Sequence, residues 1–235
     1  LAASQGNLNI TTVTGENLVR ISQPGHLLSL EIAPLNLSSE NPNSINPLSL
    51  PELLTSTGVT EANSLEINSA GQVVLKANQL RVNDGDIAIF SEGENNTITA
   101  SNATLQAAAN LTLAETILQT TGDLNLLAGN RAIIRDRNLP FRAVSGGDLS
   151  IEALGNIDIL ALNFPGVAFQ ALGDVNLISD GVISGDARFA AGGNFSILNK
   201  AGEPGTFISF YDPIISSEGD VIFGVYAGVS LKVQA

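Results

Sequence analysis

The chain has 235 residues and carries 10 Lys and Arg against 23 Asp and Glu, so its formal net charge is −13. It has no Cys, which excludes disulfide scaffolds, zinc–cysteine sites and thiol catalysis, and its only histidine, His26, excludes a multi-histidine metal site. An acidic chain is a poor partner for nucleic acid, because phosphate contacts need clustered Lys and Arg. No apolar run approaches the roughly 18 residues that a membrane span requires.

The composition predicts one all-β domain over residues 1–235. The chain contains no Met, and its first residues, LAASQGNLNI, show neither the basic nor the apolar segment of a signal peptide. We therefore expect a piece of a longer protein. Hydrophobic residues make up 44% of the chain and are mostly aliphatic, which argues against disorder.

One segment near the start interrupts the strand-like pattern. Residues 36–63 concentrate Pro, Ser and Asn, and Pro42, Pro47 and Pro51 cannot donate to a strand ladder. We predict an irregular loop insertion over 36–63, with room for one short helix in SLPELLTSTG. Insertions on repeat proteins often lie on the binding face, and the alternative is a loop that covers an edge of the fold.

A short unit recurs along the chain: Gly, then Asp or Asn, then alternating apolar and polar residues. Strong copies read GNLNI at 6–10, GDLNL at 122–126, GDLSI at 147–151, GNIDI at 155–159, GDVNL at 173–177, GNFSI at 193–197 and GDVIF at 219–223. Weaker copies are GQVVL at 71–75, GDIAI at 85–89 and GVSLKV at 228–233. The alternation predicts a strand with one buried face, and the Gly-Asp or Gly-Asn pair predicts a corner in which Gly takes a positive φ.

The spacing of these copies favours a parallel β-helix over an antiparallel sandwich. The last four strong copies begin at positions 155, 173, 193 and 219, and these steps indicate single turns of a solenoid with variable corners. In a β-helix each strand pairs with its copy one turn later, and stacked Asn and Asp side chains form ladders. The further runs VAFQA at 167–171, ARFAA at 187–191 and FISF at 207–210 predict two or three strands per turn.

The C-terminal half resembles large secreted proteins of cyanobacteria. The runs that carry the resemblance are GDLSIEALGNIDILALN at 147–163, LISDGVISGDARFAAGGNFSILN at 177–199 and DPIISSEGDVIFGVYAGVSLKVQA at 212–235, with ISQPGHLLSLEI at 21–32. They are similar to the filamentous-haemagglutinin class of exoproteins exported by two-partner secretion. The resemblance implies a right-handed β-helix, export from a Gram-negative-type bacterium to the cell surface or the extracellular space, and roles in adhesion or surface coating.

Acidic residues recur at the predicted corners, as Asp123, Asp148, Asp174 and Asp220. We expect their carboxylates to satisfy backbone N–H groups of the stack, and calcium binding by the stacked carboxylates is the alternative. Neither an EF-hand pattern nor the nonapeptide of calcium-binding β-rolls occurs. The sequence predicts no catalytic, cofactor or metal site.

Four of the ten basic residues lie in one run, RAIIRDRNLPFR, as Arg131, Arg135, Arg137 and Arg142. This local reversal of charge predicts a contact with a polyanion, because Arg pairs bidentately with carboxylate or sulfate. The alternative is a solvated bulge whose arginines pair with surface acids and contribute little.

Tyr211 is a candidate for stacking against a sugar. It lies in a predicted corner with Phe210, Asp212 and Pro213, and the alternative is a core Phe210 with Tyr211 at the rim. His26 has no second His, no Cys and no acidic neighbour before Glu31, which predicts a turn or edge residue and no catalytic triad.

Three functions from different classes remain. The first is a non-enzymatic structural or adhesive segment of a large secreted protein, with polysaccharide or cell-surface glycans as partners. The second is a polysaccharide-binding or polysaccharide-processing β-helix in which acids and Arg137 or Arg142 converge on one open face. A fibril subunit that associates end to end through open strand edges is a further alternative.

Overall fold

The computed structural model describes residues 1–14, 19–22, 29–32, 64–67, 73–76, 85–91 and 95–235. The chain divides into two units, one formed by Leu1–Thr12 with Gly85–Ala235 and the other by Val13–Asp84. Every element within the described ranges is a β-strand. Among these residues there is accordingly no helix with the length and hydropathy needed to cross a bilayer.

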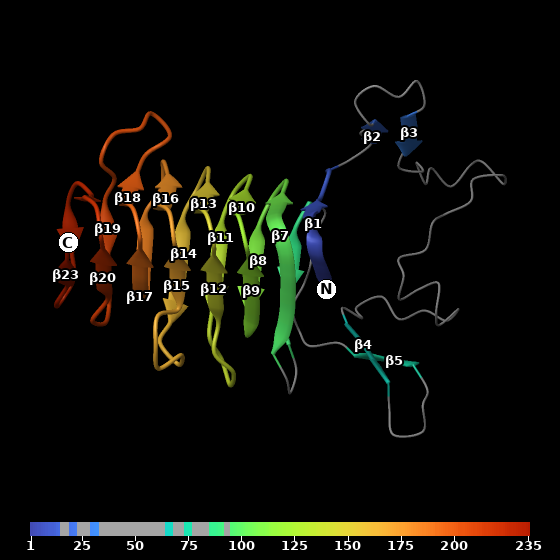
Figure 1. Ribbon diagram of the computed structural model, residues 1–235, viewed down its shortest axis with the longest axis horizontal. Coiled ribbons are helices and arrows are strands. Elements are labelled where there is room, and N and C mark those ends of the chain that lie inside the picture. The colour runs from blue at the N-terminus through green and yellow to red at the C-terminus, as the bar shows by residue number, and fades with distance from the viewer. Residues whose placement is uncertain (15–18, 23–28, 33–63, 68–72, 77–84, 92–94) are drawn as a thin grey trace. The chain divides into compact units, whose positions relative to one another are not determined.

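The larger unit is a solenoid of parallel strands with three faces, here numbered 1 to 3 (Figure 1). From β6 onward the chain follows face 2, then face 3, then face 1, and then returns to face 2. We use the word rung for one circuit of the three faces. Face 2 contains β6 (Ile87–Ile89), β8 (Leu111–Ala114), β11 (Ala132–Arg135), β14 (Ile157–Ala161), the first half of β17 (Ile183–Ala191), β19 (Phe207–Ile208) and β22 (Tyr226–Ala227).

Faces 3 and 1 are built from the strands that follow in each rung. Face 3 contains the first half of β7 (Asn96–Ala107), β9 (Thr116–Thr120), β12 (Arg142–Ser145), β15 (Phe169–Ala171), the second half of β17, β20 (Ile214–Ser217) and β23 (Lys232–Gln234). Face 1 contains the second half of β7, β10 (Leu124–Ala128), β13 (Leu149–Ala153), β16 (Val175–Ser179), β18 (Phe195–Leu198) and β21 (Val221–Ile222). β1 (Ala2–Thr11) pairs with both halves of β7.

The predicted alternation of buried and outward residues is confirmed in β10, β13, β14 and β16, whereas β17 and β18 have consecutive buried residues. Leu149 and Ile151 are fully buried, whereas Ser150 between them faces outward. The core is mostly Ala, Ile and Leu, and it contains a column of rings from Phe141 to Phe169, Phe189 and Phe195, with successive centroids 5.1–5.3 Å apart. The prediction of an all-β, parallel solenoid is therefore confirmed. Each full turn crosses three faces, with three separate strands in some rungs and two in those where β7 or β17 continues from one face to the next.

The register corrects the predicted turn lengths. The positions aligned on face 1 are Leu124, Leu149, Val175, Phe195 and Val221, so the rungs between them differ in length and the one from Val175 to Phe195 is the shortest. The copy at 155–159 belongs to β14 on face 2. The step from the copy at 155 to the copy at 173 therefore joins two different faces, and its interpretation as one turn was wrong.

The smaller unit contains two antiparallel strand pairs. β2 (Val19–Ser22) pairs with β3 (Ser29–Ile32), and β4 (Ser64–Ile67) pairs with β5 (Val73–Lys76). The weak copy at 71–75 thus contributes to an antiparallel pair and not to a parallel ladder. The predicted insertion at 36–63 and His26 lie outside the described residues.

Candidate functional site

The Asp and Asn residues at the corner between faces 3 and 1 form a continuous ladder of hydrogen bonds. The backbone N–H of Asp148 donates to Oδ1 of Asp123 at 3.0 Å, and the N–H of Asp174 donates to Oδ1 of Asp148 at 2.8 Å. The same bond recurs in other rungs, with Asn102 accepting from Asp123, Asp174 from Asn194, and Asn194 from Asp220. We call this series the corner ladder. It gives the side chains of Asn102, Asp123, Asp148, Asp174 and Asn194 a structural role in the next rung, and Asp220 ends the series with its backbone N–H as a donor.

The corner ladder also explains the glycine that precedes each strand of face 1. An ideal Cβ on Gly147 would lie 2.2 Å from Oδ1 of Asp123, and one on Gly173 would lie 2.1 Å from Oδ1 of Asp148. The ladder oxygen therefore occupies the place of a side chain. Of the repeat glycines that the structure describes, Gly85 alone has a positive φ, so the predicted positive-φ corner was wrong for the others.

Three further carboxylates organise the corner between faces 2 and 3. Buried Glu115, at a φ of 53°, accepts the backbone N–H groups of Asn138 and Leu139 with Oε1. Buried Asp186 accepts those of Phe210 at 3.0 Å and Tyr211 at 2.9 Å. These acids fix loops of the following rung.

Asp136 makes the same kind of contact, because its carboxylate accepts the N–H groups of Phe141 and Asn163. Burial raises the pKa of Asp136 above its ordinary value, and the charge of Glu115 adds to the rise, while the N–H donors oppose it. For Glu115 and Asp136 the sequence signal is an acidic residue directly after an alternating run, whereas Asp186 lies within β17 and has no such signal. The sequence patterns alone assigned no role to Glu115, Asp136 or Asp186.

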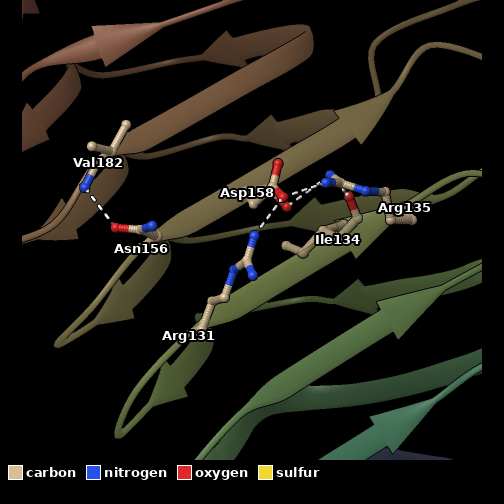
Figure 2. A network of polar contacts seen from close by, with 6 residues as sticks. All are labelled: Arg131, Ile134, Arg135, Asn156, Asp158 and Val182. Carbon is tan, nitrogen blue, oxygen red and sulfur yellow. Dashed lines mark hydrogen bonds and ion pairs between the residues drawn. The ribbon is translucent and has the colours of Figure 1, made fainter. Parts of the chain in front are cut away.

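Two of the predicted arginines share one acceptor on face 2 (Figure 2). Nη2 of Arg131 lies 3.0 Å from Oδ2 of Asp158, and Arg135 binds the same oxygen and also donates to the backbone oxygen of Asp158 at 3.1 Å. This is the pairing with a surface acid that was the alternative to polyanion binding. Asp158 lies one rung beyond both arginines in register.

The other two predicted arginines do not join this pair. Arg137 is exposed in the loop between β11 and β12, and Arg142 begins β12 on face 3. The guanidinium carbon of Arg142 lies 5.0 Å from the ring centroid of Phe164, and its Nε is buried without a hydrogen-bond partner. The four arginines are thus divided between two faces and a loop.

Tyr211 lies in the loop between β19 and β20, and its side chain is 55% exposed. Its neighbour Phe210 is 72% exposed, so the alternative of a core Phe210 was wrong. Both backbone N–H groups are bound by Asp186, which holds the two aromatic residues at the surface.

Within the described ranges, no three His, Cys, Asp or Glu residues gather as a metal site would require. No protein-family model, curated protein or solved structure matches this chain. The resemblance to the filamentous-haemagglutinin class therefore stays a prediction from the sequence runs quoted above.

Proposed function

We propose that this chain is a non-enzymatic structural or adhesive segment of a large secreted cell-surface or extracellular-matrix protein of the filamentous-haemagglutinin class. In this proposal the solenoid is a right-handed β-helix, outside the cell, that serves as a stiff support for its loops and outward side chains. Contacts with a surface are then individually weak and repeated from rung to rung, and they gain strength through multivalency.

The observation that carries this proposal is that acidic side chains are already bound to backbone N–H groups and arginines of the solenoid. Polysaccharide hydrolases need carboxyl groups that are free to transfer protons or attack the sugar, and such groups must converge on one open face. Here the carboxylates of Asp123, Asp148 and Asp174 accept backbone N–H groups, and Asp158 is held by two arginines. These acids build the solenoid.

The loops between faces 2 and 3 support presentation as the mechanism. Loops 136–141, 162–168 and 209–213 all leave the solenoid at this corner, along the lower edge of Figure 1. Glu115, Asp136 and Asp186 fix their backbones from the preceding rung. An ordered loop binds a surface without first losing conformational entropy, which favours adhesion through weak contacts.

Incubation with a panel of acidic and neutral polysaccharides, with and without calcium, tests the absence of enzymatic activity. New reducing ends and unsaturated ends are the readouts, and we expect neither above the level in buffer alone. Product that forms with the wild-type chain and disappears with R137Q or R142Q contradicts the proposal. Product that both variants form at the wild-type rate indicates a contaminating enzyme.

A further inference from the structure

The strands of face 3 carry basic side chains and no acidic residue. Arg142 begins β12, Arg188 lies in β17 and Lys232 begins β23. None of the residues 96–100, 116–120, 142–145, 169–171, 188–191, 214–217 and 232–234 is Asp or Glu. In a chain with a net charge of −13, an acid-free face with three cations is a local reversal of charge.

The register places these three cations in one column, here called the basic column. Arg142 lies beside Ala168, because Ala143 pairs with Phe169, and Ala168 lies beside Arg188, because Phe169 pairs with Phe189. Arg188 then pairs with Ile214, and Ile214 with Lys232. One strand separates each cation from the next, so their backbones are about 9.6 Å apart, given strand spacings of roughly 4.8 Å.

A second column of outward side chains lies two residues further along each strand. It also alternates from strand to strand, with its polar residues where the basic column has no cation. Polar residues lie on β9, β15 and β20, the strands that have no cation, and small apolar residues lie on β12 and β17. In order along the solenoid this column reads Gln119, Val144, Gln170, Ala190 and Ser216, with Gln234 on β23 after it. From β9 to β20, face 3 thus repeats every two rungs, with a cation and then a neutral polar group.

The cations are oriented but not neutralised. Loop 162–168 lies between two of them, with the ring of Phe164 against Arg142 and the carbonyl oxygen of Pro165 accepting Nη1–H of Arg188 at 2.6 Å. No described acid lies within 4.0 Å of the charged nitrogens of Arg142, Arg188 or Lys232, in contrast to the arginines on face 2. Stacking on a ring leaves the N–H edge of a guanidinium available to a carboxylate.

The spacing of the charges identifies the class of polymer that fits. Nucleic acid carries one charge per roughly 1.7 Å of duplex, far denser than a cation every ~9.6 Å. A polysaccharide in which a uronate alternates with a neutral sugar carries one carboxylate per disaccharide, and an extended disaccharide has about this length. The polar residues of the second column offer hydrogen bonds to the hydroxyl groups of the neutral sugar.

We infer that face 3 binds an unbranched acidic polysaccharide with one uronate per disaccharide, lying along the solenoid axis with its carboxylates on Arg142, Arg188 and Lys232. This inference rests on the adhesive function proposed above and names its ligand class. Val144 and Ile214 supply apolar surface for the C–H faces of the sugar rings.

Fluorescence anisotropy with a labelled decasaccharide of alternating glucuronate and N-acetylglucosamine tests the inference. We expect the wild-type chain to bind, with an affinity that falls as salt rises. R142Q/R188Q/K232Q is expected to weaken binding at least about tenfold, because three exposed charge pairs are lost together. R131Q/R135Q/R137Q removes the same charge from face 2 and its loop, and is expected to weaken binding by less than about twofold.

An equal loss of affinity in both triple variants shows that binding follows net charge, and it overturns the inference. The inference is also overturned if the wild-type chain does not bind the decasaccharide. Q119A/Q170A leaves the charge unchanged and is expected to weaken binding a few-fold, which separates recognition by face 3 from a folding defect. Cleavage of the decasaccharide in the same samples contradicts the proposed non-enzymatic function, whereas failure to bind contradicts the inference about face 3 alone.

Discussion

The ring of Phe207 fills the space that Gly185 leaves by having no side chain. An ideal Cβ on Gly185 would lie 2.6 Å from Cε2 of Phe207 and 3.5 Å from Cζ of Phe189. The preceding rung has Ile159 at the aligned position, so a small residue in one rung is compensated by a large one in the next. The core is therefore packed between rungs as well as within each rung.

G185A should lower the free energy of unfolding by about 1–3 kcal/mol, because the new methyl group forces the ring of Phe207 to move. Unfolding in denaturant gives the measurement, and G185A/F207L should recover part of the loss because the two sites are coupled. G6A is the matched control, since no atom lies within 4 Å of its added Cβ. Equal stability of G185A and the wild-type chain contradicts this packing.

Asp148 tests the corner ladder, because Asn can replace it and Ala cannot. D148A removes the acceptor for the N–H of Asp174 and is expected to cost about 1 kcal/mol of unfolding free energy. D148N keeps an Oδ1 acceptor, as Asn102 and Asn194 do in other rungs, and should remain within about 0.5 kcal/mol of wild type. Equal losses in D148A and D148N indicate that the carboxylate charge, and not the ladder, stabilises the corner.

The raised pKa of Asp136 leads us to expect that the stability of the folded protein depends on pH. Burial raises its pKa in the folded protein above the ordinary 3.8, so above pH 3.8 the folded state retains its proton longer than the unfolded state. Stability contributed by this group therefore falls as pH rises, until the pKa of the folded state has been passed.

Urea unfolding of the wild-type chain and D136N over a series of pH values isolates this effect, since the variant lacks the titrating group. The difference in unfolding free energy, wild type minus D136N, should decrease as pH rises from the ordinary pKa of 3.8. A difference that stays constant, or that increases with pH, contradicts the raised pKa.

Much of the fold follows from patterns within single strands. The alternation around Leu149 and Ile151 predicts a half-buried strand, because it depends on residues close together in sequence. The corner acids predict a ladder because the same Gly-Asp or Gly-Asn pair returns in successive rungs, although each ladder bond joins residues a full rung apart. Tyr211 illustrates the limit of such patterns. Its exposure depends on the bonds between its loop and Asp186, which lies one rung earlier on a different strand.

Local patterns are sufficient to predict the all-β solenoid, its corners and the alternation of buried and exposed residues, because period-2 hydrophobicity and turn residues act locally. The separation of Arg142 from the arginine run, and its place in one column with Arg188 and Lys232, follow from the folded structure alone. The cause is the register of the strands. Successive rungs differ in length through their loops, so the alignment of outward side chains is set by strand pairing across rungs and not by spacing along the chain.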